Sequence, residues 1–201
     1  MSRRSKQLEF KPLIAIYCEG DSEKVYFEML KRKYHASNVR AEKVSINSMG
    51  TKGLSLLYRA QSKIEALPKN KKIDQAYVIF DRDDLSNKEL KKCNNYARSH
   101  KIKIMFSSVN IEIWVLMHFQ PVSRVYTARE LNRLLSGEKY FNTDYSKFKG
   151  NPYDEYLVDR VKYAKNNAEI LLKRSTDPLY ERDPYTNVNN FISDIFKVSQ
   201  F

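Results

Sequence analysis

The hydrophobic residues in the first half of the chain fall into short runs that alternate with amphipathic stretches. Residues 13–18 and 76–80 are continuous apolar runs, the pattern of strands whose two faces are both buried. In residues 39–46 apolar and polar positions alternate, and residues 102–106 form a further short run rich in apolar side chains. The pattern therefore predicts four strands.

Between and after these strands, apolar positions recur at helical spacing. The expected helices are residues 23–34, 54–67, 87–99 and 111–119. Strands that alternate with helices in this way predict βαβ units, and hence an α/β fold with a mainly parallel sheet flanked by helices. Right-handed crossovers place the carboxyl ends of such strands at one edge of the sheet, where open α/β sheets bind their ligands.

The second half of the chain has a different character. Helices are expected at residues 128–135, 156–173 and 187–198, with prolines between them, and no strand as strong as the earlier ones occurs there. We therefore expect a helical C-terminal part packed on the sheet. The predicted division is a basic arm at 1–11, an α/β domain at 12–120 and a helical extension at 121–201.

Composition narrows the choice of partners. A net charge of +12, from 36 Lys and Arg against 24 Asp and Glu, favours a nucleic acid, because neutralising phosphates releases counterions; a solvated basic surface is the alternative. The apolar runs are far shorter than the roughly 20 residues of a membrane helix, and none follows the basic N-terminus as in a signal peptide. Cys18 and Cys93 lack metal-ligand spacing. The expectation is a reduced, cytoplasmic protein without a membrane segment, its oligomeric state left open.

Acidic residues follow two of the predicted buried strands. Glu19 closes the first, and Asp81 and Asp83 close the third. Residues two apart in extended backbone point to the same face, so this aspartate pair can share one cation. If the two strands are neighbours, Glu19 faces the pair, and hard oxygen ligands of this kind favour Mg²⁺ or Mn²⁺. The alternative is that these acids only cap turns, as Asp often does after a strand.

Four further residues near this edge are candidates for supporting roles. Glu23 and Asp84 stand close to the two strand ends along the chain, although Asp84 is expected to point away from the pair. Glu112 begins a predicted helix directly after a strand, where a metal or substrate role and a structural role are both open. His118 is either an acid behind the site or a histidine satisfied within the core.

Basic and aromatic residues offer contacts to a polyanion. The tentative phosphate-binding residues are Lys24, Lys52 and Arg82, for which exposure to water is the alternative. Tyrosines are interleaved with lysines at 139–140 and at 145–149, an arrangement that can stack on single-stranded bases, although core packing explains most tyrosines equally well.

Four stretches of the chain together resemble a known family. They are residues 16–23, 79–84, 110–119 and 183–188. The first two, a strand with Glu-Gly and a strand with Asp-x-Asp, resemble the Toprim fold shared by topoisomerases, primases and OLD-family nucleases. The third resembles the Glu-x-Trp-x-x-x-His-Phe segment of the RloB-like family, small Toprim proteins linked to restriction and phage-defence loci. The fourth resembles its Asn-Pro-x-Thr-x-Val signature, with Asp183 in place of Asn.

The resemblance implies a function. Glu19 matches the Toprim glutamate, a general base or acid or a metal ligand, and Asp81 and Asp83 match the metal-binding pair. No tyrosine-bearing topoisomerase domain and no zinc module accompanies them, so the resemblance implies Mg²⁺- or Mn²⁺-dependent hydrolysis of DNA or RNA in phage defence. Two alternatives remain. One is a nucleic-acid-binding or sensor module without turnover, and the other is a nuclease subunit active only beside an ATPase or other partner from a defence locus.

Overall fold

The fold is built on one central sheet. The structure, a computed structural model, describes residues 12–43, 52–68 and 72–198, so the predicted arm at 1–11 lies outside the described residues. The strands are β1 (Ile14–Cys18), β2 (Val39–Lys43), β3 (Gln75–Asp81), β4 (Ile102–Ser108) and β5 (Tyr185–Thr186). Their order is β2-β1-β3-β4-β5, with β1 to β4 parallel and β5 antiparallel to β4. The predicted α/β fold with a mainly parallel sheet is confirmed, and the arrangement is consistent with a Toprim-like one.

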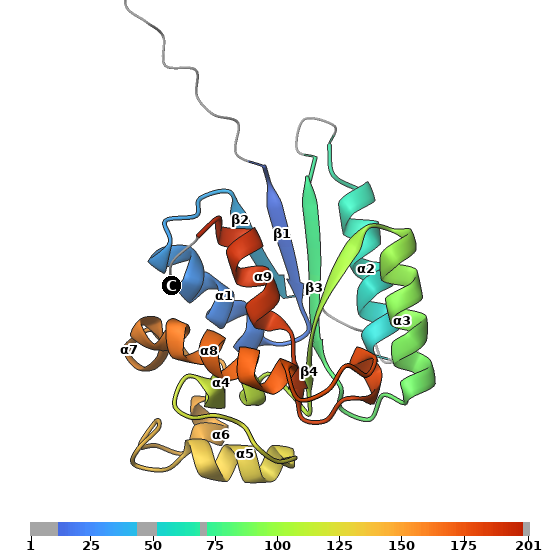
Figure 1. Cartoon of the computed structure of the whole chain (residues 1–201). Coiled ribbons are helices and arrows are strands. Elements are labelled where there is room, and N and C mark those ends of the chain that lie inside the picture. Colours follow the sequence, from blue (N-terminus) through green and yellow to red (C-terminus); the bar gives the residue numbers. More distant parts are fainter. Residues whose placement is uncertain (1–11, 44–51, 69–71, 199–201) are drawn as a thin grey trace, which may run out of the picture.

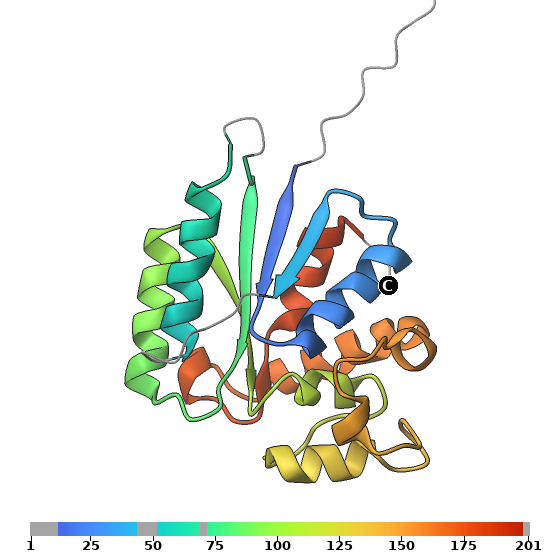
Figure 2. The same ribbon diagram turned by 180° about the vertical axis from the view of Figure 1, so that it is seen from behind.

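Helices cover both faces of the sheet (Figures 1 and 2). On one face lie α2 (Lys52–Glu65) and α3 (Asn87–Ser99), and on the other lie α1 (Asp21–Lys33) and α9 (Val188–Phe196). Successive residues of a strand point to opposite faces, so Ile16 packs in the core beneath α1 while Tyr17 packs in the core beneath α2 and α3. Both faces of the strand are therefore buried, as its continuous apolar run predicted.

The C-terminal part is helical, apart from β5. After α4 (Glu112–Met117) come α5 (Ala128–Leu135), α6 (Tyr145–Phe148), α7 (Asp154–Leu157), a 3-10 helix (Val158–Arg160), α8 (Val161–Leu172), a second 3-10 helix (Leu179–Glu181), β5 and α9. The single helix expected at 156–173 is interrupted at Val158–Arg160. Periodicity did not signal this break, because the buried residues Leu157 and Val161 keep helical spacing across it.

The strand β5 was not expected, and side chains explain why it forms. Asn187 accepts a hydrogen bond from the Phe106 backbone N–H at 2.8 Å and donates to the Ile104 carbonyl at 3.1 Å. Thr186 and Ser107 join their hydroxyls at 3.0 Å across the two strands. These bonds lie in or beside the stretch 183–188, which therefore fastens the C-terminal part to the edge of the sheet. A two-residue strand is too short for apolar alternation to reveal it.

The segment before Gln120 and the segment after it contribute to one core. The larger cluster of buried side chains contains Ile16 and Met29 from the first segment and Leu131, Val161 and Ile192 from the second. Among the described residues, no helix has both the length and the apolar character that crossing a bilayer requires.

Candidate active site at the carboxyl edge of the sheet

Two neighbouring strands bring the first predicted acids together. Strands β1 and β3 pair directly, with Cys18 opposite Ile79. The Glu19 backbone N–H donates to the Ile79 carbonyl at 3.2 Å, and the Asp81 backbone N–H donates to Glu19 Oε2 at 3.4 Å. The Glu19 carboxyl group therefore lies against the end of β3, at the edge where parallel strands bind ligands.

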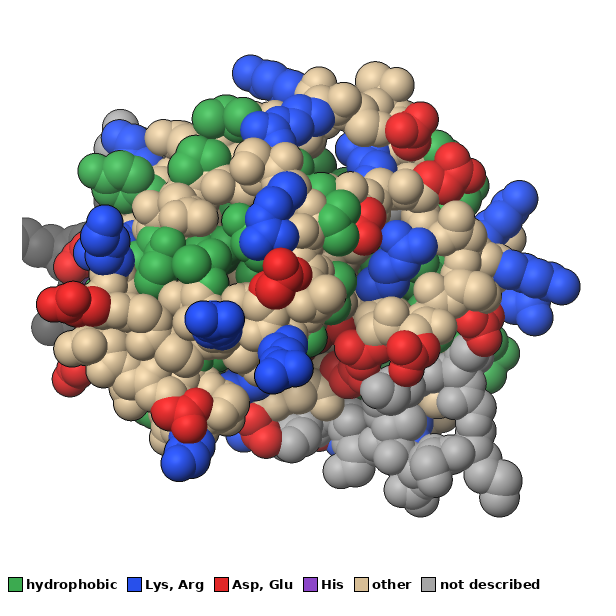
Figure 3. Space-filling model, turned by 90° about the horizontal axis from the view of Figure 1, so that it is seen from below, with side chains coloured by type: hydrophobic (Ala, Val, Ile, Leu, Met, Phe, Trp, Pro, Cys, Tyr) green, Lys and Arg blue, Asp and Glu red, His purple; other side chains and the backbone are tan. Residues whose placement is uncertain are grey.

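A cavity of about 420 Å³ opens at this edge. Its polar lining comes from Glu19, Asp21, Ser22, Glu23, Asp81, Asp83, Asn110 and Lys149. Figure 3 looks at the end of the molecule that carries α5 and α6, where a group of Asp and Glu side chains stands apart from the Lys and Arg side chains. All three acids predicted to be catalytic thus line one cavity.

Asp83 reaches the cavity by a different route from the one expected. Strand β3 ends at Asp81, and Asp83 lies in a turn with a left-handed φ of 40° rather than in extended backbone. Asp tolerates this conformation better than most residues. The turn is held by the Asp83 N–H, which donates to the Val109 carbonyl at 3.4 Å. The prediction that extended backbone points Asp81 and Asp83 to the same face was therefore wrong, although both residues line the cavity.

Glu23, predicted only as a possible supporting residue, lines the cavity itself. It is in the first turn of α1 and only 3% exposed. Its Oε2 has no hydrogen-bond partner among the residues that the structure describes. A Cβ atom on Gly20 would stand 2.7 Å from this oxygen, so the glycine after Glu19 leaves the space that the carboxylate occupies. Burial, aided by Glu112 and Glu19, raises the pKa of Glu23 to about 7.

Glu112 is also part of the site. It is the first residue of α4, it is fully buried, and its Oε1 lies 2.9 Å from Lys149 Nζ. The Tyr145 hydroxyl donates to the same oxygen at 3.4 Å and lies 3.1 Å from the Tyr153 hydroxyl. The other oxygen, Oε2, has no hydrogen-bond partner within the described part of the chain. Sequence reasoning had left the role of Glu112 open, and the structure places it behind the cavity with the other acids.

The electrostatics of the site follow from these positions. Burial raises the pKa of Asp81 well above its usual range, and the negative charges of Glu23, Glu112 and Glu19 raise it further. Burial alone would lower the pKa of Lys149, but Glu112, Asp81 and Glu23 outweigh it and the net shift is upward. Four carboxyl groups thus share one ammonium group in a partly dry space. Such a cluster needs either protons or a cation.

The donor set suits a hard divalent cation. At this site, four buried oxygens have no hydrogen-bond partner among the described residues: Glu23 Oε2, Asp81 Oδ1, Glu112 Oε2 and Asn110 Oδ1. Carboxylate and amide oxygens are the ligands that Mg²⁺ and Mn²⁺ prefer. Within the described residues, no group of three or more His, Cys, Asp or Glu side chains is arranged so that it could hold a metal ion. One oxygen of Glu112 is held by Lys149 instead. The oxygens of the site therefore suit a divalent metal by their chemistry but not by their present arrangement, in which Lys149 competes for Glu112.

The remaining predicted residues lie elsewhere. His118 is in the core, where its Nδ1 N–H donates to the Trp114 carbonyl at 3.0 Å and its Nε2 accepts from the Tyr26 hydroxyl at 3.2 Å. It is buried in the core and does not line the cavity, which agrees with the core interpretation, whereas an acid role behind the site stays a prediction. Asp84 is exposed and does not line the cavity.

Two of the three predicted phosphate contacts, Lys24 and Arg82, do not line the cavity either. Lys24 is exposed on α1 and does not line it, and Arg82 donates to Asn87 Oδ1 at 2.8 Å. The side chain of Lys52 is outside the described residues. Contact of these residues with phosphate stays a prediction. Among the described residues, the basic residue that lines the cavity is Lys149, which the sequence had placed only in a run of tyrosines and lysines.

The fold and the site together define a class of protein. It is the class of α/β proteins with an acidic cavity at the carboxyl edge of a mainly parallel sheet. A family model described as RloB-like protein matches residues 14–195, and the chain belongs to the RloB-like family. Neither the curated proteins nor the solved structures include a match to this chain.

Proposed function

We propose that this protein is a divalent-metal-dependent phosphodiesterase that hydrolyses DNA or RNA. The observation that carries the proposal is a set of buried oxygens on Glu23, Asp81 and Glu112 that have no hydrogen-bond partner among the described residues, beside an open cavity at the carboxyl edge of the sheet. Leaving such oxygens buried without a hydrogen bond is costly, so the set supports a ligand that completes it. The net charge of +12 supports a polyanionic substrate. As the family resemblance implies, we place this activity in defence against phage.

Each residue of the site has a role in this proposal. Asp81, Asp83 and Glu23 would hold Mg²⁺ or Mn²⁺, with Glu112 behind them. When bound, the cation would supply Lewis-acid stabilisation of the negative charge that develops on the phosphoryl group. Glu19 accepts a proton from the attacking water, because its carboxyl group lies at the cavity and is oriented by the Asp81 backbone N–H.

Lys149 has a separate role. Its side chain is 39% exposed and bridges the buried Glu112 to the open cavity. It offsets part of the negative charge of the acids before a substrate arrives, and its ammonium group is placed to meet a phosphate oxygen. The attraction of the cavity for phosphate thus comes from Lys149 as well as from a bound cation.

The test is a cleavage assay on DNA, RNA and tRNA with Mg²⁺ or Mn²⁺ against EDTA. Asp81→Asn should lower cleavage at least about a hundredfold, since removing one group that supports the transition state typically costs that much. Asp84→Asn is the matched control, because Asp84 is an exposed carboxylate in the same turn that does not line the cavity. Equal cleavage by the wild type and Asp81→Asn would contradict the proposal.

A specific observation favours a second candidate. The ion pair between Lys149 and Glu112 lets the cluster persist with less need of a metal, as in a nucleic-acid-binding or sensor module without turnover. Binding of nucleic acid without cleavage under any metal condition would support this candidate. Cleavage that starts only when an ATPase partner from the same locus is added would support the subunit alternative instead.

A further inference from the structure

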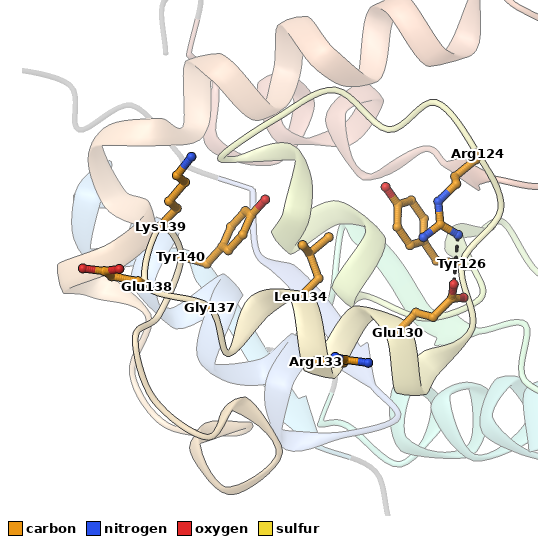
Figure 4. A pocket seen from close by; sticks show the side chains of 9 residues that line it. All are labelled: Arg124, Tyr126, Glu130, Arg133, Leu134, Gly137, Glu138, Lys139 and Tyr140. Atoms are coloured by element: carbon orange, nitrogen blue, oxygen red, sulfur yellow. Dashed lines mark hydrogen bonds and ion pairs between the residues drawn. The ribbon is translucent and has the colours of Figure 1, made fainter.

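A second concave site lies beside the carboxylate cavity. It is a groove of about 600 Å³ formed by α5 and the residues on either side of it, and we call it the α5 groove. Figure 4 shows Tyr126 and Tyr140 on either side of Leu134, with Arg124 next to the first ring and Lys139 next to the second. The groove therefore combines two aromatic rings, an apolar floor and cationic side chains.

One wall of the groove presents a flat cationic surface. The guanidinium group of Arg124 lies 4.0 Å from the centroid of the buried Tyr126 ring. Its Nη1 donates to Glu130 Oε1 at 3.0 Å and to the Val125 carbonyl at 2.9 Å, which fixes the plane of the group. The side chain remains 57% exposed, so a planar ligand can reach its outer face. A guanidinium held over an aromatic ring is a surface on which nucleobases stack.

The opposite wall is also fixed. The Tyr140 hydroxyl donates to Gln120 Oε1 at 2.7 Å, and its ring packs edge-on against Phe119 with centroids 5.3 Å apart. Tyr140 is only half-buried, and Lys139 beside it is exposed. Both walls are thus rigid before a ligand arrives, so binding costs little conformational entropy.

The groove and the cavity share the helix α5. Ala128, the first residue of α5, lines the carboxylate cavity, whereas Leu134 near its end lines the α5 groove. A helix rises 1.5 Å per residue, so these two positions are about 9 Å apart along its axis. Since successive nucleotides advance by about 3.4 Å along a stacked strand, roughly three of them span this distance.

We propose that the α5 groove binds unpaired nucleotides of the polymer whose phosphate enters the carboxylate cavity, an inference that rests on the proposed function. Arg133 and Lys139 supply charge for the backbone, while Glu130 is already engaged by Arg124 and by the Thr127 N–H at 2.7 Å. A duplex hides the faces of its bases, so stacking surfaces of this kind select single strands, loops or ends. An acidic peptide could use the charges but not the two planar walls.

The test is binding of a short labelled oligothymidylate, measured by fluorescence anisotropy in EDTA with the full chain, so that neither metal nor turnover enters. Arg124→Ala and Tyr140→Leu should each weaken binding about fivefold or more, the usual loss for one stacking partner. Arg124→Lys should weaken it nearly as much, because it keeps the charge and loses the plane. Arg98→Ala, which removes an exposed charge from α3, should change binding less than about twofold.

Several results would overturn the inference. They are wild-type affinity in Arg124→Lys and Tyr140→Leu, tighter binding of a duplex of equal length, or full displacement of the oligonucleotide by an equally charged polyglutamate. Thermal unfolding checks that each variant is folded. If Arg124→Ala does not fold, Arg124→Lys still tests the role of the guanidinium group. Because binding is read without metal, a protein that binds through this groove but never cleaves would refute only the phosphodiesterase proposal. One that cleaves while the groove variants bind normally would refute only the groove.

Discussion

Glu23→Gln should make the metal-free protein more stable at neutral and alkaline pH. The native pKa of Glu23 is raised from 4.5 to about 7, so the folded state holds a proton that the unfolded state has lost between these values. The free energy of unfolding therefore falls as the pH rises from 4.5 to about 7, and the loss is complete above that. A neutral glutamine keeps the shape of the side chain without the charge.

The size of the effect follows from the same shift. A difference of about 2.5 pKa units corresponds to about 3 kcal/mol at about pH 8, and for a domain of this size to roughly 6–12 °C in Tm. Part of this belongs to the neighbouring acids, which relax together with Glu23, so the figure is an upper value. At about pH 4 the wild type is itself protonated at Glu23, and the two proteins should be equally stable.

The assay is urea unfolding followed by circular dichroism, at about pH 8 and about pH 4, in EDTA and in Mg²⁺. Mg²⁺ should stabilise the wild type at the higher pH, because a ligand that binds only the folded state adds RT ln(1 + [L]/Kd), and it should stabilise Glu23→Gln less. Glu28→Gln is the matched control, since it removes a partly exposed carboxylate of the same helix that pairs with Lys31.

One outcome would refute this reasoning directly. If Glu23→Gln were no more stable than the wild type in EDTA at about pH 8, the buried carboxylate would not be under electrostatic strain. If Mg²⁺ stabilised the wild type and Glu23→Gln equally, Glu23 would not be a ligand. The first result would show that burial of the Glu23 carboxylate does not destabilise the fold. The second would show only that Glu23 does not bind the metal.

Two further predictions concern other parts of the chain. Lys149→Met should strengthen the stabilisation of the fold by Mg²⁺, because the competitor for Glu112 is gone, and it should still lower cleavage. Lys147→Met, the control, removes an 86% exposed lysine and should change neither quantity. Weaker stabilisation by Mg²⁺ in Lys149→Met would argue against competition between Lys149 and the metal. Burial lowers the pKa of His118 from 6.5 to about 4, so the unfolded state gains the proton first and stability falls by up to about 3 kcal/mol as the pH drops through this window. In urea unfolding, His118→Gln should lose this fall in stability with pH, whereas His100→Gln should keep it. An equal dependence on pH in the wild type and both variants would show that protonation of His118 does not contribute to stability.

Local patterns were sufficient for much of the fold. The bounds expected for α3 and α5 agree with the structure, because each helix begins with a capping box that is local in sequence, Ser86 with Glu89 and Thr127 with Glu130. The continuous apolar runs predicted β1 and β3, since a strand buried on both faces has few polar positions. The rule for parallel crossovers then placed Glu19 and Asp81 at one edge without any coordinates.

Turns and distant contacts were not accessible in this way. The left-handed turn that carries Asp83 could not be read from strand alternation, because alternation applies only while the backbone is extended. Strand β5 depends on Asn187 bonding to the backbone of β4, a pairing between residues far apart in sequence. Neither leaves a periodic signal.

The sequence by itself therefore determined the four parallel strands and the two acids at their carboxyl edge, because the hydrophobic period of each strand and the crossovers between strands depend on residues close together in the chain. Only the tertiary structure decided that Glu23 and Glu112 join these acids, that Lys149 pairs with Glu112, and that His118 stays in the core. The reason is that burial and charge coupling depend on which segments pack over the edge. That packing is the sum of many small contacts, and no single stretch of the chain encodes it.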